Sequence, residues 1–266
     1  MIALQNIETD EQIIERLRDR FAILEDMTKA CKSGKVRAMI VSGAPGVGKS
    51  FGVEKVLSKH DTIADIAGDQ SLKKYEICKG ALSALGLYAK LFAFRNEKNI
   101  LVFDDCDSIF GDEVSLNLAK AALDTSAKRV IHWNTDSRLL KEAGIPNSFE
   151  FKGGIIFITN IQFSSIRSKK LKDHLAALES RCHYLDLTIH TDREKMLRVR
   201  QIVSDGMLDK YDLTQADVAS IISWIDDNKT KLRELSLRTV IKAADLMSHF
   251  KDRWVSVAEL TLIKSN

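Results

Sequence analysis

The stretch GAPGVGKS, residues 43–50, constrains the fold more than any other part of this sequence. It fits the phosphate-binding pattern G-x-x-x-x-G-K-[ST], and it stands between an apolar segment and a segment that can form a helix. Glycines let such a loop turn tightly, so that its backbone amides point at phosphate oxygens near the amino end of the helix. The pattern predicts that Lys49 reaches the β- and γ-phosphates and that the Ser50 hydroxyl coordinates Mg²⁺. The predicted nucleotide-binding residues of this loop are Gly43, Ala44, Pro45, Gly46, Val47, Gly48, Lys49, Ser50 and Phe51.

Three short segments are apolar almost throughout and end in glycine or polar residues: RAMIVSG (37–43), ILVFDD (100–105) and GIIFITN (154–160). Strands that are apolar on both faces belong to parallel sheets covered by helices. Segments with helical spacing of apolar residues, such as 82–97 and 115–127, lie between them. This alternation predicts an α/β layered domain.

The pattern changes to helices alone after about residue 190. Thr191 and Glu194 can form a capping box at the start of the first of these helices. A further helix is predicted at the amino terminus, over residues 9–32. We therefore expect an α/β nucleotide-binding domain over residues 1–190 and a small helical domain over residues 191–266.

Composition argues against several classes of protein. The four cysteines are widely spaced and form no CxxC pair, which indicates buried thiols in a reducing compartment rather than a zinc site or disulfides. No apolar run is long enough to span a membrane, and the amino terminus lacks the apolar block of a signal peptide. We expect a cytoplasmic protein with no membrane partner. The net charge of +3 is a weak indication of nucleic acid.

The segment ILVFDD ends in two aspartates at the carboxyl edge of the expected sheet. Asp104 is expected to bind Mg²⁺, and Asp105 to polarise the attacking water. In isolation, two solvated aspartates at a strand end would be the simpler interpretation. Beside a phosphate-binding loop, the catalytic interpretation is favoured.

With these motifs the chain resembles the AAA+ ATPases over residues 30–250, and among them clamp-loader subunits and DNA motors of phage or bacterial type. The resemblance implies a P-loop core with a five-stranded parallel sheet of strand order 5-1-4-3-2, and a carboxyl-terminal helical lid. It also implies ATP and Mg²⁺ as cofactors, ATP hydrolysis, and a ring of identical subunits that is expected to be hexameric.

The resemblance also assigns roles to three further residues. Asn160, at the end of GIIFITN, matches sensor 1, a polar side chain between the acidic residues and the γ-phosphate. Arg238 matches sensor 2, a lid arginine folded over the nucleotide, with Arg233 as a nearby alternative. Arg181 in ESRCHYLDL matches the arginine finger, which acts on the nucleotide of a neighbouring subunit. A surface arginine paired with Glu179 is the alternative for that residue.

Asp105 departs from the family pattern, which usually has glutamate at this position. Aspartate is one methylene shorter, so its carboxylate is expected to lie roughly 1 Å or more further from the water unless the site contracts. Slow hydrolysis, or hydrolysis in an assembled ring alone, would follow. Asp107 is a fallback base, although it lies beyond the usual position.

Residues 128–154 form an insertion before GIIFITN, and its segments RVIHWN and SFEFKG are expected to pair as a hairpin. Insertions here resemble hairpins that line the central pore of some DNA motors. The basic residues of the insertion are Arg129, His132, Arg138, Lys141 and Lys152. Trp133 either stacks on a base or packs into the core.

Two classes of function remain open. One is a DNA-associated ring, loader or motor in replication or recombination, and the other is a chaperone or unfoldase that remodels a protein partner. Segment 76–82 carries Lys79-Gly80 instead of the aromatic–hydrophobic–glycine order of protein-threading loops, which weakens the second class. The basic run 166–172 is interpreted as a solvated face.

Overall fold

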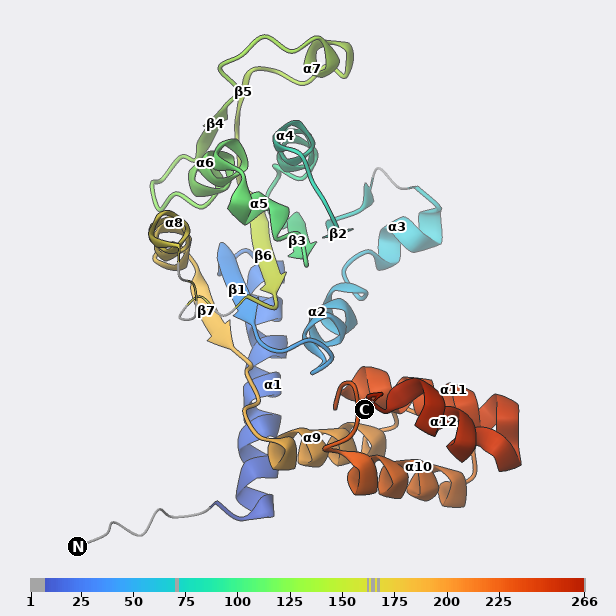
Figure 1. Cartoon of the computed structure of the whole chain (residues 1–266). Helices are drawn as coiled ribbons and strands as arrows, with labels where there is room; N and C mark the ends of the chain where they lie inside the picture. The colour runs from blue at the N-terminus through green and yellow to red at the C-terminus, as the bar shows by residue number, and fades with distance from the viewer. Residues whose placement is uncertain (1–7, 70–71, 162, 164–165, 167, 266) are drawn as a thin grey trace, which may run out of the picture. The chain divides into compact units, whose positions relative to one another are not determined.

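The computed structural model of the chain describes residues 8–69, 72–161, 163, 166 and 168–265 (Figure 1). The basic run 166–172 therefore lies partly outside the described residues. The chain divides into two compact units. The helical unit comprises Met1–Phe21, Ala44–Gly48 and Thr188–Asn266, and the sheet unit comprises Ala22–Gly43 and Lys49–Leu187. The junction after Leu187 lies close to the predicted boundary at residue 190, but no sequence pattern indicated that residues 44–48 group with the carboxyl-terminal helices.

Five parallel strands form the sheet, in the order β2 (Tyr75–Lys79), β3 (Ile100–Asp104), β6 (Gly154–Thr159), β1 (Ala38–Ser42) and β7 (His183–Asp186) (Figure 1). This confirms the predicted α/β class. The predicted order 5-1-4-3-2 differs from this in one detail: two further strands, β4 and β5, come before the fourth strand of the sheet and pair apart from it. The fourth and fifth strands of the sheet are therefore β6 and β7.

The three central strands of the sheet are buried on both faces, as their apolar sequences require. Every residue of β1, β3 and β6 is buried. Ile40, Phe103 and Phe157 share a core with the helices of one face. Those helices are α4 (Ala84–Ala93), α5 (Ser108–Gly111), α6 (Glu113–Ala122) and α8 (Lys169–Glu179).

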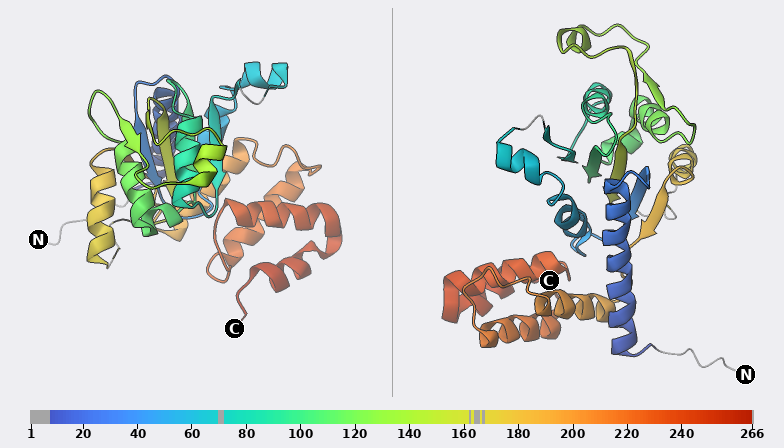
Figure 2. Two further views of the ribbon diagram at one scale, coloured as in Figure 1. Left: turned by 90° about the horizontal axis from the view of Figure 1, so that it is seen from above. Right: turned by 180° about the vertical axis from the view of Figure 1, so that it is seen from behind.

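The opposite face is covered by the carboxyl-terminal half of α1 (Asp10–Lys32), which lies behind β1 in Figure 1 and in front of it in the reverse view of Figure 2. Helix α2 (Lys49–Leu57) packs on this half of α1 so closely that a Cβ on Gly52 would lie 2.7 Å from Leu24. Helix α3 (Thr62–Ala67) follows α2. Glycine at position 52 thus lets the helix after the P-loop approach α1.

The insertion folds as a separate antiparallel pair, β4 (Val130–His132) and β5 (Ser148–Glu150), with helix α7 (Arg138–Glu142) between them. Ile131 pairs with Phe149, and both side chains are buried. The two flanking positions of each strand are exposed, so the pair shows the alternation of a sheet with one buried face.

The helical unit contains α9 (Asp192–Ser204), α10 (Gln215–Asn228), α11 (Leu237–Phe250), a 3-10 turn (Lys251–Arg253) and α12 (Trp254–Leu262). The capping box of Thr191 and Glu194 is present at the start of α9. The core of this unit includes Trp224 and Trp254, whose ring centroids are 5.7 Å apart. No helix in the described part of the chain is long and apolar enough to cross a membrane.

Candidate nucleotide site

Three glycines determine the shape of the loop that joins β1 to α2. Gly43, Gly46 and Gly48 have φ angles of 152°, 71° and 103°, which residues with a side chain rarely adopt. At Gly43 a Cβ would also lie 2.9 Å from the carbonyl carbon of Leu187. Glycine is therefore required here for conformation and, at Gly43, for close approach as well.

Lys49 begins α2, and its side chain is buried. Its Nζ donates hydrogen bonds to the carbonyl oxygen of Gly43 at 2.6 Å and to Oδ1 of Asn160 at 2.8 Å. Asn160 in turn donates from Nδ2 to Oδ1 of Asp105 at 2.8 Å. Because β3 and β6 are neighbours in the sheet, their carboxyl ends bring Asp105 and Asn160 together beside Lys49.

Ser50 and Asp104 form a second contact at the same edge, where the Ser50 hydroxyl donates to Oδ1 of Asp104 at 2.9 Å. Hydroxyl and carboxylate oxygens are ligands that Mg²⁺ prefers, and Mg²⁺ on a nucleotide takes few protein ligands beside water and phosphate oxygens. Within the described residues, no group of three or more His, Cys, Asp and Glu could hold a metal ion. The pair therefore fits a magnesium ion that is bound together with a nucleotide.

The two acids that follow Asp104 have different environments. Asp105 is exposed and has a φ of 54°, in the left-handed region that few residues other than glycine adopt. Asp107 is half-buried and accepts a hydrogen bond from Oγ1 of Thr159 at 2.8 Å. Burial raises the pKa of Asp107. Of the two, Asp105 is the acid that bonds to Asn160, so the geometry favours it over Asp107 as the base.

Arg181 lies two residues before β7, at the amino end of the strands, whereas Lys49 and Asn160 lie at the carboxyl end. A five-residue strand at roughly 3.3 Å per residue separates the two edges by about 15 Å. The guanidinium of Arg181 donates to the carbonyl oxygen of Ala177 at 2.6 Å. Among the described residues it forms no ion pair with Glu179. The fold therefore keeps Arg181 away from the cluster around Lys49 in its own chain.

The predicted lid arginines lie at the surface of the helical unit. Arg238 is exposed on α11 and has no hydrogen bond or ion pair with another residue that the structure describes. Arg233 is also exposed and donates to the Ser265 hydroxyl at 3.3 Å. Phe51, the last predicted residue of the loop, has a side chain that is 69% exposed. The nucleotide contacts of Arg238 and Phe51 stay predictions.

Sequence reasoning missed four residues of the helical unit, which we call the buried polar cluster: Arg198, Gln201, Glu234 and Ser236. Each carries a buried polar atom that has no hydrogen-bond partner. Arg198 and Gln201 lie one helical turn apart on the buried side of α9, where Met196 and Val199 are also buried. Charged and amide side chains on the apolar stripe of a helix were the available signal.

The cluster lies against the P-loop residues that belong to the same unit. The backbone amide of Leu237 donates to the carbonyl oxygen of Gly46 at 3.0 Å. A Cβ on Gly46 would lie 2.6 Å from Cβ of Ser236, and one on Gly48 would lie 3.9 Å from an NH2 nitrogen of Arg198. Glycine at position 46 therefore makes room for Ser236 in the segment before α11, and Gly48 lies within ordinary contact distance of Arg198 on α9.

Sequence reasoning also gave Lys79 no role at this edge. Its Nζ lies 3.7 Å from Oδ2 of Asp104. The parallel register of β2 and β3 pairs Lys79 with Asp104, so strand pairing was the signal that could have found it. Lys79 adds a cation beside the proposed magnesium ligand.

Most basic and aromatic side chains of the insertion already have partners within the chain. Arg129 is buried and donates to the carbonyl oxygens of Ala122 at 2.8 Å and Gly153 at 3.0 Å. The ring of Trp133 lies 5.4 Å from that of Tyr88, and it packs against the main core. This favours the core role of Trp133 over base stacking. Three further basic residues form ion pairs: Arg138 with Glu142, Lys141 with Asp136, and Lys152 with Glu150.

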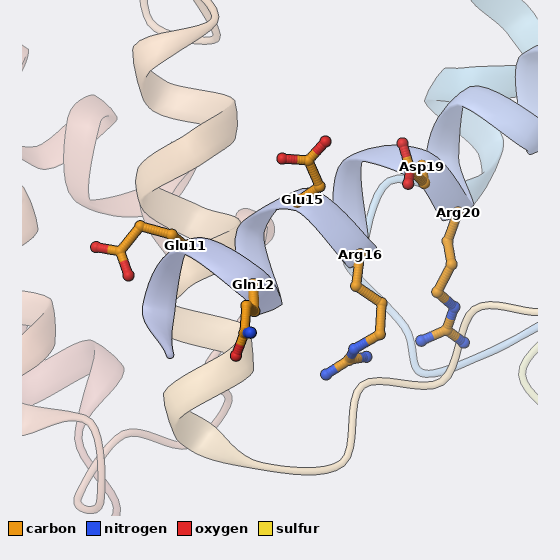
Figure 3. Close-up of a pocket in the computed structure, with 6 residues that line it drawn as sticks. All are labelled: Glu11, Gln12, Glu15, Arg16, Asp19 and Arg20. Carbon is orange, nitrogen blue, oxygen red and sulfur yellow. The ribbon is translucent and has the colours of Figure 1, made fainter. Parts of the chain in front are cut away.

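A shallow groove lined by charged and amide residues on the first turns of α1 is a separate candidate site (Figure 3). Its lining residues are Glu11, Gln12, Glu15, Arg16, Asp19 and Arg20. Arg16 forms ion pairs with Glu8 at 2.8 Å and Glu194 at 2.7 Å, and Arg20 donates to the carbonyl oxygen of Thr188 at 3.1 Å. These arginines connect α1 to the start of α9 within the helical unit, so we assign the groove a structural role.

The fold is that of the AAA+ P-loop ATPases. A solved structure of a DNA replication initiation factor matches with a TM-score of 0.52 and 11% identity, over 96% of this chain and 66% of that chain. The ADP form of the Aeropyrum pernix ORC2 protein matches with a TM-score of 0.47 and 14% identity, over 92% of this chain and 68% of that chain. No protein-family model matches the chain.

A curated relative defines the family more narrowly. The chain is 39% identical over 254 residues to an uncharacterized 36.7 kDa protein from the nrdC–mobD intergenic region of Enterobacteria phage T4. The match covers 94% of this chain and 76% of the phage protein. The chain therefore belongs to the family of that phage protein.

Proposed function

We propose that this protein is a Mg²⁺-dependent ATPase that assembles as a ring and uses ATP hydrolysis to remodel or move a macromolecule. The observation that carries the proposal is the hydrogen-bonded chain from Lys49 through Asn160 to Asp105, beside the pair of Ser50 and Asp104. These groups provide a phosphate-binding cation, metal ligands and a base at one sheet edge, which are the parts that phosphoryl transfer to water requires.

Each residue has a distinct task in this reaction. Lys49 exchanges its bonds to Gly43 and Asn160 for phosphate oxygens when nucleotide binds. Ser50 and Asp104 would hold Mg²⁺, which neutralises charge on the β- and γ-phosphates. Asp105 accepts a proton from the attacking water, and Asn160 orients the carboxylate through its amide.

The proposal includes a second copy of the chain. Arg181 lies at the edge of the sheet opposite Lys49, so we propose that it stabilises transition-state charge on the nucleotide of a neighbouring subunit. Such an arrangement repeats around a ring of identical subunits, for which we propose six. Arg238 is proposed as the sensor that contacts the γ-phosphate from its own chain.

For the macromolecule we propose DNA, with the protein acting in the cytoplasm. The resemblance to a DNA replication initiation factor and the sequence pI of about 8.5 support this choice. A protein partner is the second candidate, because most of the basic side chains of the insertion are buried or ion-paired. Leu139, on α7 of the insertion, is 64% exposed and would suit an apolar partner surface.

The test is the rate of ATP hydrolysis alone, with single- or double-stranded DNA, and with an unfolded protein. The Asp105→Asn variant serves as the control for contaminating ATPase. We expect DNA to stimulate the wild-type rate and unfolded protein to leave it unchanged. The reverse result would favour the protein remodeller, and no hydrolysis under any condition would overturn the ATPase proposal.

A further inference from the structure

Arg198 is a buried cation without a carboxylate partner. Arg198 is 7% exposed, and its guanidinium carbon lies 3.6 Å from the ring centroid of Phe21. Within the described part of the chain it forms no ion pair, and its Nε has no hydrogen-bond partner. Burial lowers the pKa of Arg198 to about 10. Burying a charge without an ion-pair partner costs free energy. A ligand that supplies negative charge would reduce this cost.

Gln201 presents a second unused donor beside it. Oε1 of Gln201 accepts a hydrogen bond from the Arg198 guanidinium at 2.6 Å, which leaves its Nε2 as the free group. That Nε2 is buried and has no partner, and Gln201 is also 7% exposed. Residues three apart lie on the same face of a helix. Two adjacent unsatisfied donors suit the oxygens of an anion.

These donors lie next to the loop that is proposed to hold phosphates. If Gly48 carried a Cβ, that atom would lie 3.9 Å from Nη2 of Arg198 and 3.8 Å from Cε1 of Phe21. Gly48 directly precedes Lys49, and the backbone amides of such a loop point at phosphate oxygens. Glu234 of the buried polar cluster lies near a different glycine of the loop. Its Oε1, an acceptor without a hydrogen-bond partner, would be 3.1 Å from a Cβ on Gly46.

We propose that Arg198, supported by Gln201, binds phosphate oxygens of the nucleotide in the P-loop. The proposal rests on the nucleotide binding proposed above and adds a binding residue that no motif of the sequence contains. Arg198 differs from Arg238 because it is buried beside a loop glycine, while Arg238 is exposed. The charge of Arg198 is therefore less screened by water, and its loss costs more affinity.

The first test measures dissociation constants for ATP and ADP with Mg²⁺. Arg198→Gln should weaken both nucleotides by about 10- to 100-fold, the range expected for hydrogen bonds to charged groups. Arg198→Lys should recover part of the loss, and Gln201→Leu should show a smaller one. Arg200→Gln is the matched control, because Arg200 is an exposed residue of the same helix whose NH2 donates to Asp226 at 2.5 Å. It should bind nucleotide within about twofold of wild type.

The second test separates phosphate from the base and ribose. Inorganic triphosphate with Mg²⁺ displaces a fluorescent ATP analogue, and its affinity should fall by the same factor as that of ATP in Arg198→Gln. Unchanged triphosphate affinity together with weaker ATP binding would mean that Arg198 contacts base or ribose, which would overturn the proposal. Arg198→Gln binding equal to the Arg200→Gln control would also overturn it.

The folding of each variant is measured by urea unfolding without nucleotide. Arg198 forms no ion pair with the residues that the structure describes, and burial disfavours its charge more than the interaction with Asp205 favours it. Arg198→Gln should therefore unfold at a urea concentration no lower than wild type does. If Arg198→Gln fails to fold, Arg198→Lys and Gln201→Leu carry the test, and wild-type triphosphate affinity in both would contradict the proposal. A wild-type protein that binds no nucleotide would instead refute the proposed function itself.

Discussion

The two edges of the five-stranded sheet carry different chemistry. At the carboxyl edge, Lys49, Asn160 and Asp105 form a hydrogen-bonded chain in which the donors and acceptors of neighbouring strands meet. At the amino edge, the guanidinium of Arg181 donates to the backbone of the preceding helix α8, at the carbonyl oxygen of Ala177. The proposed binding groups and the proposed base thus gather at one edge, and the proposed finger lies at the other. If Arg181 is the finger that we propose, a single chain holds an incomplete set of groups for hydrolysis.

The largest expected effect comes from the amino edge. Arg181→Ala should bind ATP as wild type does but hydrolyse it about 10³- to 10⁵-fold more slowly, because an arginine finger neutralises charge that develops in the transition state. The measurement is single-turnover hydrolysis beside equilibrium binding. If Arg181→Ala turns over as fast as wild type, Arg181 is a surface residue, and the amino edge of the sheet contributes nothing to hydrolysis.

Mixing two inactive variants tests whether Arg181 acts on a neighbour. Arg181→Ala subunits retain an intact P-loop, and Lys49→Ala subunits retain an intact Arg181. In mixed assemblies some interfaces combine the two intact parts, so activity should partly return. If the subunits co-assemble and no activity returns, Arg181 does not work in trans.

The next effect comes from the carboxyl edge. Asp105→Asn should keep ATP affinity and lower turnover by about 10²- to 10⁴-fold, the contribution of a general base. Asp105→Glu sharpens the comparison, because a longer side chain should raise the rate if reach limits it. If Asp105→Asn is as active as wild type, Asp105 is not the base, and Asp107 becomes the residue to test. Asp107 accepts a hydrogen bond from Thr159.

A change at the start of α9, in a residue given no part in the proposed site, should alter stability and leave turnover unaffected. Burial would raise the pKa of Glu194, but hydrogen bonds from Arg16, Thr191 and His190 lower it to about 2 from an ordinary 4.5. Its stabilisation is therefore present above pH 4.5 and is lost as pH falls toward 2. Glu194→Gln should lower the unfolding free energy by about 1–2 kcal/mol at pH 7, after allowance for the partial exposure of Arg16.

Urea unfolding at several pH values checks this prediction. The difference between Glu194→Gln and wild type should shrink progressively below pH 4.5. A difference that is constant from pH 7 to pH 3 would mean that the ion pair with Arg16 is not its source.

The smallest expected effect concerns the helical unit. Arg238→Ala should weaken ATP more than ADP by about two- to fivefold, because an exposed arginine interacts with the γ-phosphate in a strongly screening environment. Titrations with the two nucleotides check it. Equal losses for ATP and ADP would leave Arg238 without a sensor role and would make Arg233 the residue to test.

The sequence was informative where function depends on residues close together in the chain. GAPGVGKS specifies a loop between strand and helix. Apolar segments that end in Asp105 and Asn160 predict that these two residues lie at one edge of the sheet, where they share a hydrogen bond. The buried polar cluster was not predictable in this way. Arg198 and Ser236 are far apart in sequence, and their meeting at the P-loop depends on tertiary packing rather than on any periodicity.

Charge counting failed in the insertion for a related reason. Arg138 and Lys141 indicated a basic surface, yet Glu142 and Asp136 neutralise them in ion pairs. A count of basic residues contains no information about which acids lie beside them. The partner of the protein therefore could not be predicted from net charge.

Calorimetric titration of the protein with ATP and Mg²⁺ tests the central claim most directly, with Lys49→Ala as the comparison. The account predicts one nucleotide bound per chain, and no detectable binding by Lys49→Ala, because the phosphates lose their main cationic contact in a water-poor site. Binding by Lys49→Ala as tight as that of wild type, or no binding by the wild-type chain, would contradict it.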